Sequence, residues 1–160
     1  MVGRFGERDE LNRLYESGES EFVAVYGRRR VGKTYLVRET FGDRFSFCHT
    51  GLPNASRQQQ LVHFKKSLAE AGYKGVLPKD WFAAFSALGE TVEKCGMRRK
   101  VIFIDELPWL DTAKSDFLMA LETFWNEWAS ARKDVLLIVC GSAAAWMVQN
   151  LFRNRGGGRD

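Results

Sequence analysis

The chain has 160 residues, of which 45% are apolar and 13% aromatic. This content is enough to fill the core of one domain and excludes a disordered chain. The formal charge of +4 is too small to indicate a nucleic-acid-binding protein by itself.

The cysteines and the apolar runs narrow the class of protein further. Cys48, Cys95 and Cys140 are an odd number without close spacing, which predicts neither a disulfide framework nor a zinc site. No apolar run approaches the length of a membrane span, and the start of the chain is too charged for a signal peptide. We therefore expect a cytoplasmic protein with no membrane partner.

Helix and strand patterns alternate from the start of the chain. The first helix carries Leu11, Leu14 and Tyr15 on one face, and Gly18 is placed to end it. The elements that follow are a strand over 21–26, a helix over 34–41 and a strand over 45–49.

The second half of the chain continues this alternation. Ser56 with Gln59 resembles a capping box at the start of one helix, and Asp80 is placed to cap the next. Two strands, over 101–105 and 135–141, are almost continuously apolar. Between them lies the strongest amphipathic stripe, which we expect to pack on a sheet rather than to hold a cofactor. Its members are Phe117, Leu118, Leu121, Phe124, Trp125 and Trp128.

This order of elements predicts the fold class. Strands that alternate with helices are typical of an α/β fold with right-handed crossovers. Continuously apolar strands indicate a parallel sheet whose two faces are both covered.

A glycine-bounded loop lies between the first strand and the following helix. The run "GRRRVGKT" fits G-x-x-x-x-G-K-[ST], whose backbone N–H groups cradle phosphates at a helix N-terminus. We expect Lys33 to reach the β- and γ-phosphates of a nucleotide and the Thr34 hydroxyl to bind Mg²⁺. The predicted nucleotide-binding residues are Gly27, Arg28, Arg29, Arg30, Val31, Gly32, Lys33, Thr34 and Tyr35.

The three arginines of this loop need not touch phosphate, because the backbone forms the cradle. We expect Arg28 and Arg29 to point outward and raise the positive potential around an anionic ligand, and Arg30 to pair with a neighbouring acid. A nucleic-acid role for the triplet remains the alternative.

An acidic pair ends the third strand. Four apolar residues followed by Asp105 and Glu106 match the Walker B pattern. We expect Asp105 to bind the same Mg²⁺ as Thr34 and Glu106 to polarise an attacking water. In the alternative interpretation, the two carboxylates only cap the next helix.

Two further polar residues end strands at the same edge. Ser142 is predicted to contact the γ-phosphate or the attacking water as a sensor; its alternative role is to cap the following helix. For His49 a structural role is expected, because no metal partner is visible in the spacing.

Together these motifs resemble the AAA-type, STAND-like P-loop ATPases of bacteria and archaea. The similarity runs from about Phe5 to Gly157 and rests on "SEFVAVYGRRRVGKTYLVRE", "FIDELPWLDT" and "LLIVCGSA". The early "FGERDEL" resembles the family's segment near the adenine; Gly6 is kept, but Glu7 stands where arginine is usual.

The resemblance implies a three-layer αβα P-loop NTPase fold with a mainly parallel sheet of order 2-3-4-1. In the family a fifth strand and C-terminal domains follow. The resemblance therefore implies that 1–160 is a truncated ATPase core with a glycine-rich tail over 153–160. It also implies a catalytic set of Glu106, Lys33 and Ser142, with Thr34 and Asp105 at the metal.

The implied truncation leads to two expectations about partners. Without a fifth strand, 21–26 becomes an apolar sheet edge, so the chain should self-associate. The missing C-terminal domains are themselves expected partners, and a missing arginine finger would slow hydrolysis. Arg153, Arg155 and Arg159 do not have the spacing to replace it.

A second basic region precedes the last two strands. If these strands are neighbours, both clusters lie at the amino edge of the sheet, opposite the nucleotide. This region could bind an acidic partner or nucleic acid; in the alternative interpretation it is a solvated edge. Its residues are Arg98, Arg99, Lys100, Arg132 and Lys133.

The function predicted from these residues is Mg²⁺-dependent ATP binding and hydrolysis by a molecular switch. One alternative is a non-hydrolysing nucleotide-binding scaffold with a nucleic-acid or protein partner. A small-molecule phosphotransferase is another, although neither an acceptor pocket nor an arginine-bearing lid is visible in the sequence.

Overall fold

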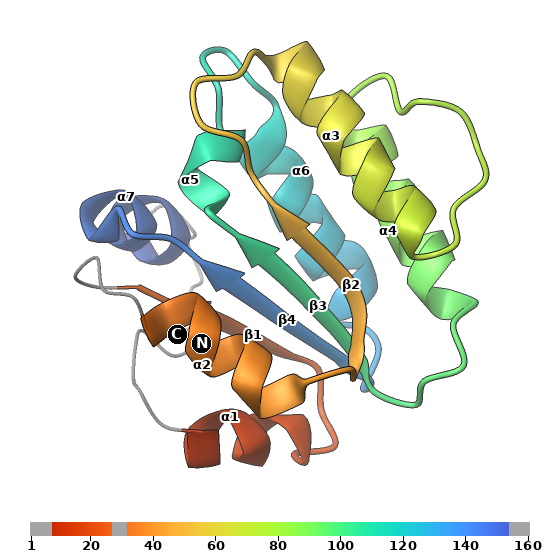
Figure 1. The fold of residues 1–160 in the computed structure, drawn as a ribbon, viewed down its shortest axis with the longest axis vertical. Helices are drawn as coiled ribbons and strands as arrows, with labels where there is room; N and C mark the ends of the chain where they lie inside the picture. Colours follow the sequence, from red (N-terminus) through yellow and green to blue (C-terminus); the bar gives the residue numbers. More distant parts are fainter. Residues whose placement is uncertain (1–7, 27–31, 154–160) are drawn as a thin grey trace.

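The computed structural model describes residues 8–26 and 32–153. It has an α/β fold in which four parallel strands form one sheet (Figure 1). The strand order is β1-β4-β3-β2, which confirms the order 2-3-4-1. The strands are β1 (Glu21–Val25), β2 (Phe45–Thr50), β3 (Lys100–Asp105) and β4 (Val135–Cys140), within one residue of the predicted ends.

Helices cover both faces of this sheet, which gives the three layers (Figure 1). One face is covered by α1 (Arg8–Tyr15) and α2 (Gly32–Phe41). The other face is covered by α3 (Arg57–Glu70), α4 (Trp81–Glu93), α6 (Phe117–Thr123) and the π-helix η1 (Phe124–Ala129). Short helices follow the carboxyl ends of β3 and β4: α5 (Leu107–Leu110), α7 (Ala144–Val148) and the π-helix η2 (Gln149–Arg153). Within the described ranges, no helix has the length and apolar character needed to cross a membrane.

Alternating strand residues supply two separate hydrophobic cores. In β1, Val23 and Val25 pack with Leu11 and Val37 on the α1–α2 face. Phe22 and Ala24 belong to the core on the α3–α4–α6 face. All six residues of β3 and of β4 are buried, as expected for central parallel strands.

The predicted helix caps are present. Ser56 Oγ accepts from Gln59 N at 3.1 Å, and Gln59 Oε1 accepts from Ser56 N at 2.8 Å, which completes the capping box. Asp80 Oδ1 accepts from Ala83 N at 2.8 Å at the start of α4. These bonds fix where α3 and α4 begin.

The aromatic stripe packs on the sheet as predicted, but it does not form one regular α-helix. The chain changes from α6 to the wider η1 at Phe124. In this geometry Trp125 packs against Phe22 of β1, with ring centroids 5.2 Å apart. Phe124 and Trp128 stack on each other at 5.1 Å, beside Gly89 of α4. The close packing of Trp128 against a glycine of the neighbouring helix accompanies this change of helix type.

Candidate active site

The predicted metal ligands come together at the carboxyl edge of the sheet. Thr34 lies in the first turn of α2, and Asp105 is the last residue of β3. Thr34 Oγ1 donates a hydrogen bond to Asp105 Oδ2 at 2.7 Å, although 71 residues separate them. Two hard oxygen groups from separate elements therefore converge on one point, and this chemistry suits a magnesium ion.

The charge of Lys33 acts on the carboxyl group of Glu106. Burial and then the neighbouring Asp105 raise the pKa of the Glu106 carboxyl, whereas Lys33 acts to lower it. Lys33 likewise acts to lower the pKa of the buried Cys140 thiol, which burial and Asp105 raise. A carboxylate with a raised pKa is a stronger base, which is what activation of a water molecule requires.

The backbone turns sharply at Glu106. Its φ of 53° and ψ of 48° place it in the left-handed region, which is uncommon for a residue other than glycine. Its N–H donates to Asp105 Oδ1 at 2.9 Å, and its carbonyl accepts from Trp109 N at 3.1 Å. Glu106 occupies the N-cap position of α5, but its side chain forms no cap hydrogen bond with that helix.

The chain after β4 packs against the chain after β3. A Cβ on Gly141 would lie 2.8 Å from Pro108 Cδ and 2.9 Å from Met147 Sδ, so only glycine allows this approach. Ser142 follows, half-buried, at the same edge as Asp105. The N-cap of α7 is Ala143, which makes no side-chain cap, so the structure gives no support to Ser142 as a cap. Its sensor role stays a prediction.

The structure describes only some of the remaining residues predicted to bind the nucleotide. Gly27, Arg28, Arg29, Arg30 and Val31 fall outside the described residues, so the predictions about the cradle and its arginines stay predictions. Gly32 is the first residue of α2. Tyr35 is 66% exposed on that helix and belongs to none of the contacts above.

His49 is part of the core rather than of this cluster. Its side chain is buried against Phe64, and its Nδ1 lies 2.7 Å from Ser67 Oγ. Burial first, and then the nearby His63, lowers its pKa to about 3. These contacts support the structural role expected for it.

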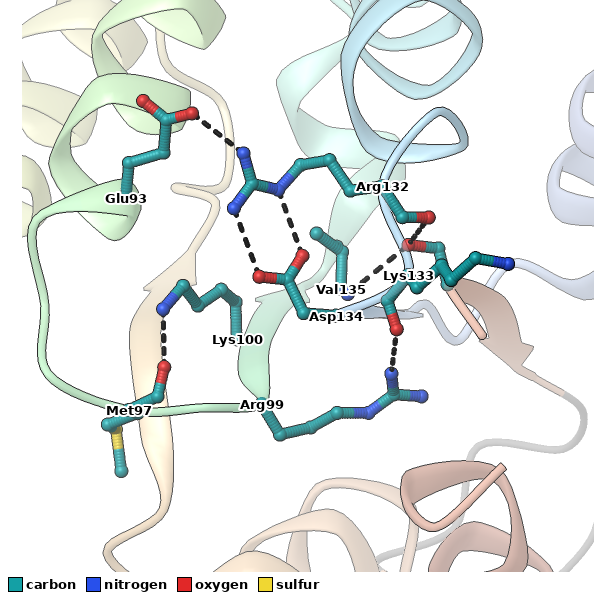
Figure 2. Close-up of polar contacts among 9 residues, drawn as sticks. Glu93, Met97, Arg99, Lys100, Arg132, Lys133, Asp134 and Val135 are labelled. Atoms are coloured by element: carbon teal, nitrogen blue, oxygen red, sulfur yellow. Dashed lines mark hydrogen bonds and ion pairs between the residues drawn. The ribbon is translucent and has the colours of Figure 1, made fainter. Parts of the chain in front are cut away.

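The second basic region lies at the amino edge of neighbouring strands, as the sequence predicted (Figure 2). Much of its charge is engaged within the protein. Arg132 forms a bidentate pair with Asp134 at 2.9 and 3.0 Å and reaches Glu93 at 2.7 Å. Its guanidinium also lies over the Trp128 ring, 4.8 Å from the centroid.

Arg99 and Lys100 of this region bind backbone carbonyl groups. Arg99 donates to Lys133 O at 3.0 Å, and Lys100 donates to Met97 O (Figure 2). Arg99 also donates to Leu14 O at 2.8 Å. Lys133 lies 3.5 Å from a Glu19 oxygen, and Arg98 is exposed. These contacts hold the starts of β3 and β4 together, which is a structural reason for the basic residues.

Gly51 and Gln60, which contact the segments around the Glu106 turn, are not among the residues predicted from the sequence. Gly51 directly follows β2, a position where glycine can signal a close backbone approach. Gln60 is a polar residue one helical turn before Phe64, on the buried face of α3. A glycine directly after a strand and a polar residue on a buried helix face are the features of the sequence that could have identified these two residues.

Comparison with known proteins assigns the family. A family model described as an ATPase domain predominantly from Archaea matches residues 1–156. The chain belongs to this ATPase domain family. A curated relative, an uncharacterised protein of Methanocaldococcus jannaschii, is 29% identical to this chain over 153 residues, which are 95% of this chain and 32% of that protein. The chain thus spans about a third of the curated relative's length.

Solved structures support the fold. The Walker-type ATPase PABY2304 of Pyrococcus abyssi matches with a TM-score of 0.63 and 16% identity, over 92% of this chain and 48% of that one. A structure of Drosophila ORC bound to DNA matches with a TM-score of 0.51 and 12% identity, over 84% and 73% of the two chains. Together with the family match, these likenesses show that this member of the ATPase domain family has a P-loop NTPase fold.

Proposed function

We propose that this domain binds ATP with Mg²⁺ across Thr34 and Asp105 and hydrolyses the γ-phosphate bond. The observation that carries the proposal is the 2.7 Å contact between Thr34 Oγ1 and Asp105 Oδ2, with Glu106 as the next residue. In P-loop ATPases, a hydroxyl from the phosphate loop and a strand-end carboxylate hold the metal.

Each side chain has a distinct task in this mechanism. Thr34 and Asp105 would hold the ion, which when bound neutralises charge on the β- and γ-phosphates. Lys33 neutralises further phosphate charge from the start of α2. Glu106 orients a water molecule and accepts its proton as the oxygen attacks phosphorus, and the bond to the ADP oxygen breaks. Ser142 contacts the γ-phosphate or that water.

The domain would serve as a switch because hydrolysis removes the γ-phosphate from contact with residues at two strand ends. We propose that this loss changes how the domain docks against the further parts of a longer protein. The relative's greater length supports such parts, since the chain covers 32% of it.

Phosphate release and ATP binding, measured on the same protein, test the proposal. In single-turnover experiments, Glu106→Gln should lower the rate by at least about a hundredfold, because the amide cannot accept the proton. ATP affinity should stay within about twofold of the original, since the substitution leaves phosphate binding intact.

The matched control is Glu127→Gln, the same substitution on the distant helix η1. It should change neither quantity. Unchanged phosphate release in Glu106→Gln would remove Glu106 as the base. Binding without any release in the unsubstituted chain would favour the non-hydrolysing scaffold instead.

A further inference from the structure

Gln60 joins two loops that meet beside Glu106. The residue lies on α3 with 0% of its surface exposed. Its Nε2 donates to Leu52 O at 2.7 Å and to Trp109 O at 3.1 Å, and its Oε1 accepts from Leu52 N at 3.1 Å. One buried amide therefore ties the loop that follows β2 to the helix α5 that follows β3.

Both of these segments contact the backbone at the Glu106 turn. Trp109 N donates to the Glu106 carbonyl at 3.1 Å, and Gly51 N donates to the Asp105 carbonyl at 3.0 Å. A Cβ on Gly51 would lie 2.8 Å from the Glu106 carbonyl oxygen and 3.2 Å from Leu110 Cγ. The β2 loop thus packs directly against the turn, and the Gln60 amide holds it there.

The turn needs such support because its conformation is unfavourable. Glu106 has a φ of 53°, which a residue with a side chain adopts only when its surroundings hold it. The backbone angles at Glu106 also decide where its carboxylate lies. A loop that relaxes by a fraction of an ångström would therefore move the proposed base away from the water.

We propose that Gln60 is a positioning residue for Glu106. It touches neither the Thr34–Asp105 pair nor the proposed reaction centre, and acts by holding the β2 loop and α5 against the Glu106 backbone. This inference rests on the proposed function, because it assigns Gln60 to the orientation of the base in that reaction.

The test is a double-mutant cycle between Gln60→Leu and Glu106→Gln, read by phosphate release under saturating ATP. Gln60→Leu should lower kcat about ten- to a hundredfold, the loss expected from a small misplacement of a catalytic group, while KM changes by less than about twofold. In the Glu106→Gln background the same substitution should cause no further loss, because the group that it positions no longer acts.

A general structural defect must be separated from this effect. Leu68→Ala is the control, since Leu68 is buried in the last turn of the same helix and makes none of the loop contacts. Its melting temperature should fall while kcat stays near the original value. Hydrogen exchange should speed up at the Gly51 and Trp109 amides in Gln60→Leu but not in Leu68→Ala.

Gly51→Ala provides a second route if Gln60→Leu fails to fold. It pushes a methyl group against the Glu106 carbonyl without leaving a buried polar group unpaired, and it should also lower kcat with KM retained. Unchanged kcat in the folded variants, or an equal loss in Leu68→Ala, would overturn the positioning role. A chain that releases no phosphate, or an unimpaired Glu106→Gln, would instead overturn the proposed function itself.

Discussion

At the scale of residues, the site combines groups whose signals in the sequence differ greatly. Thr34 and Asp105 lie in motifs whose chemistry requires their residue types, so their approach could be predicted before any geometry was known. The left-handed turn at Glu106 could not be predicted from the sequence, because nothing in "FIDELPW" indicates a positive φ at a glutamate. The contacts around this turn come from segments distant in the sequence: Gly51 N donates to the Asp105 carbonyl, and Gln60 bonds Leu52 and Trp109.

A second residue-scale feature is the buried imidazole of His49. Its pKa falls from an ordinary 6.5 to about 3, so it folds in the neutral form. Between those two pH values the unfolded chain binds a proton that the folded protein does not. The stabilising contribution is therefore complete above pH 6.5 and is lost as the pH falls toward about 3.

We expect His49→Gln to remove this pH dependence. The free energy of unfolding of the original protein should fall relative to that of the variant by up to about 1.4 kcal/mol per pH unit across this window. Glutamine keeps a hydrogen-bonding group toward Ser67 and does not titrate. Urea unfolding of both proteins between pH 4 and 7 measures the difference, and parallel curves would contradict the assignment.

At the scale of elements, hydrophobic periodicity located the strands and the main helices well. The helix caps at Ser56 and Asp80 could also be predicted from the sequence, because they depend on residues close in the sequence. The change from α6 to η1 could not be predicted from the sequence; it accompanies the packing of Trp128 against Gly89 of α4, a contact between elements. Local patterns thus specify where elements lie, whereas contacts between elements decide their finer geometry.

The amino-edge contacts of Arg132 give a prediction at this scale. Arg132→Lys keeps the charge but cannot form the bidentate pair with Asp134 together with the Glu93 contact. We expect the variant to be less stable by about 1 kcal/mol, measured by urea unfolding. Arg98→Lys, at an exposed position, is the matched control and should change stability little.

The same pair of variants tests the structural interpretation of the basic region. Both substitutions keep the positive charge, so a surface that binds nucleic acid through charge alone would retain its affinity in both variants, and that affinity would fall with added salt. Equal stability of Arg132→Lys and the original protein would contradict the structural role of Arg132. Figure 2 shows the Arg132 guanidinium between the Glu93 and Asp134 carboxylates that it binds.

At the scale of the whole molecule, the sheet order places the phosphate-loop helix and the acidic strand end at one edge. The helix α2 follows β1, and Asp105 ends β3, with β4 between the two strands. Parallel strands bring all their carboxyl ends to this edge, where α/β proteins bind ligands. In the described part of the chain β1 pairs with β4 alone, so self-association through β1 stays a prediction.

The fold and the family follow from the sequence because the P-loop and the acidic strand end are long, specific patterns. We propose that the site at this one sheet edge holds a nucleotide and a divalent ion together.

Calorimetric titration with ATP, in the presence and absence of Mg²⁺, tests this claim most directly. We expect one ATP to bind per chain with Mg²⁺, and Thr34→Val to weaken that binding at least about tenfold while Thr34→Ser retains it, because only the hydroxyl can hold the ion. The absence of heat and of a thermal shift from folded protein would contradict the claim, as would Mg²⁺-dependent binding that Thr34→Val leaves unchanged.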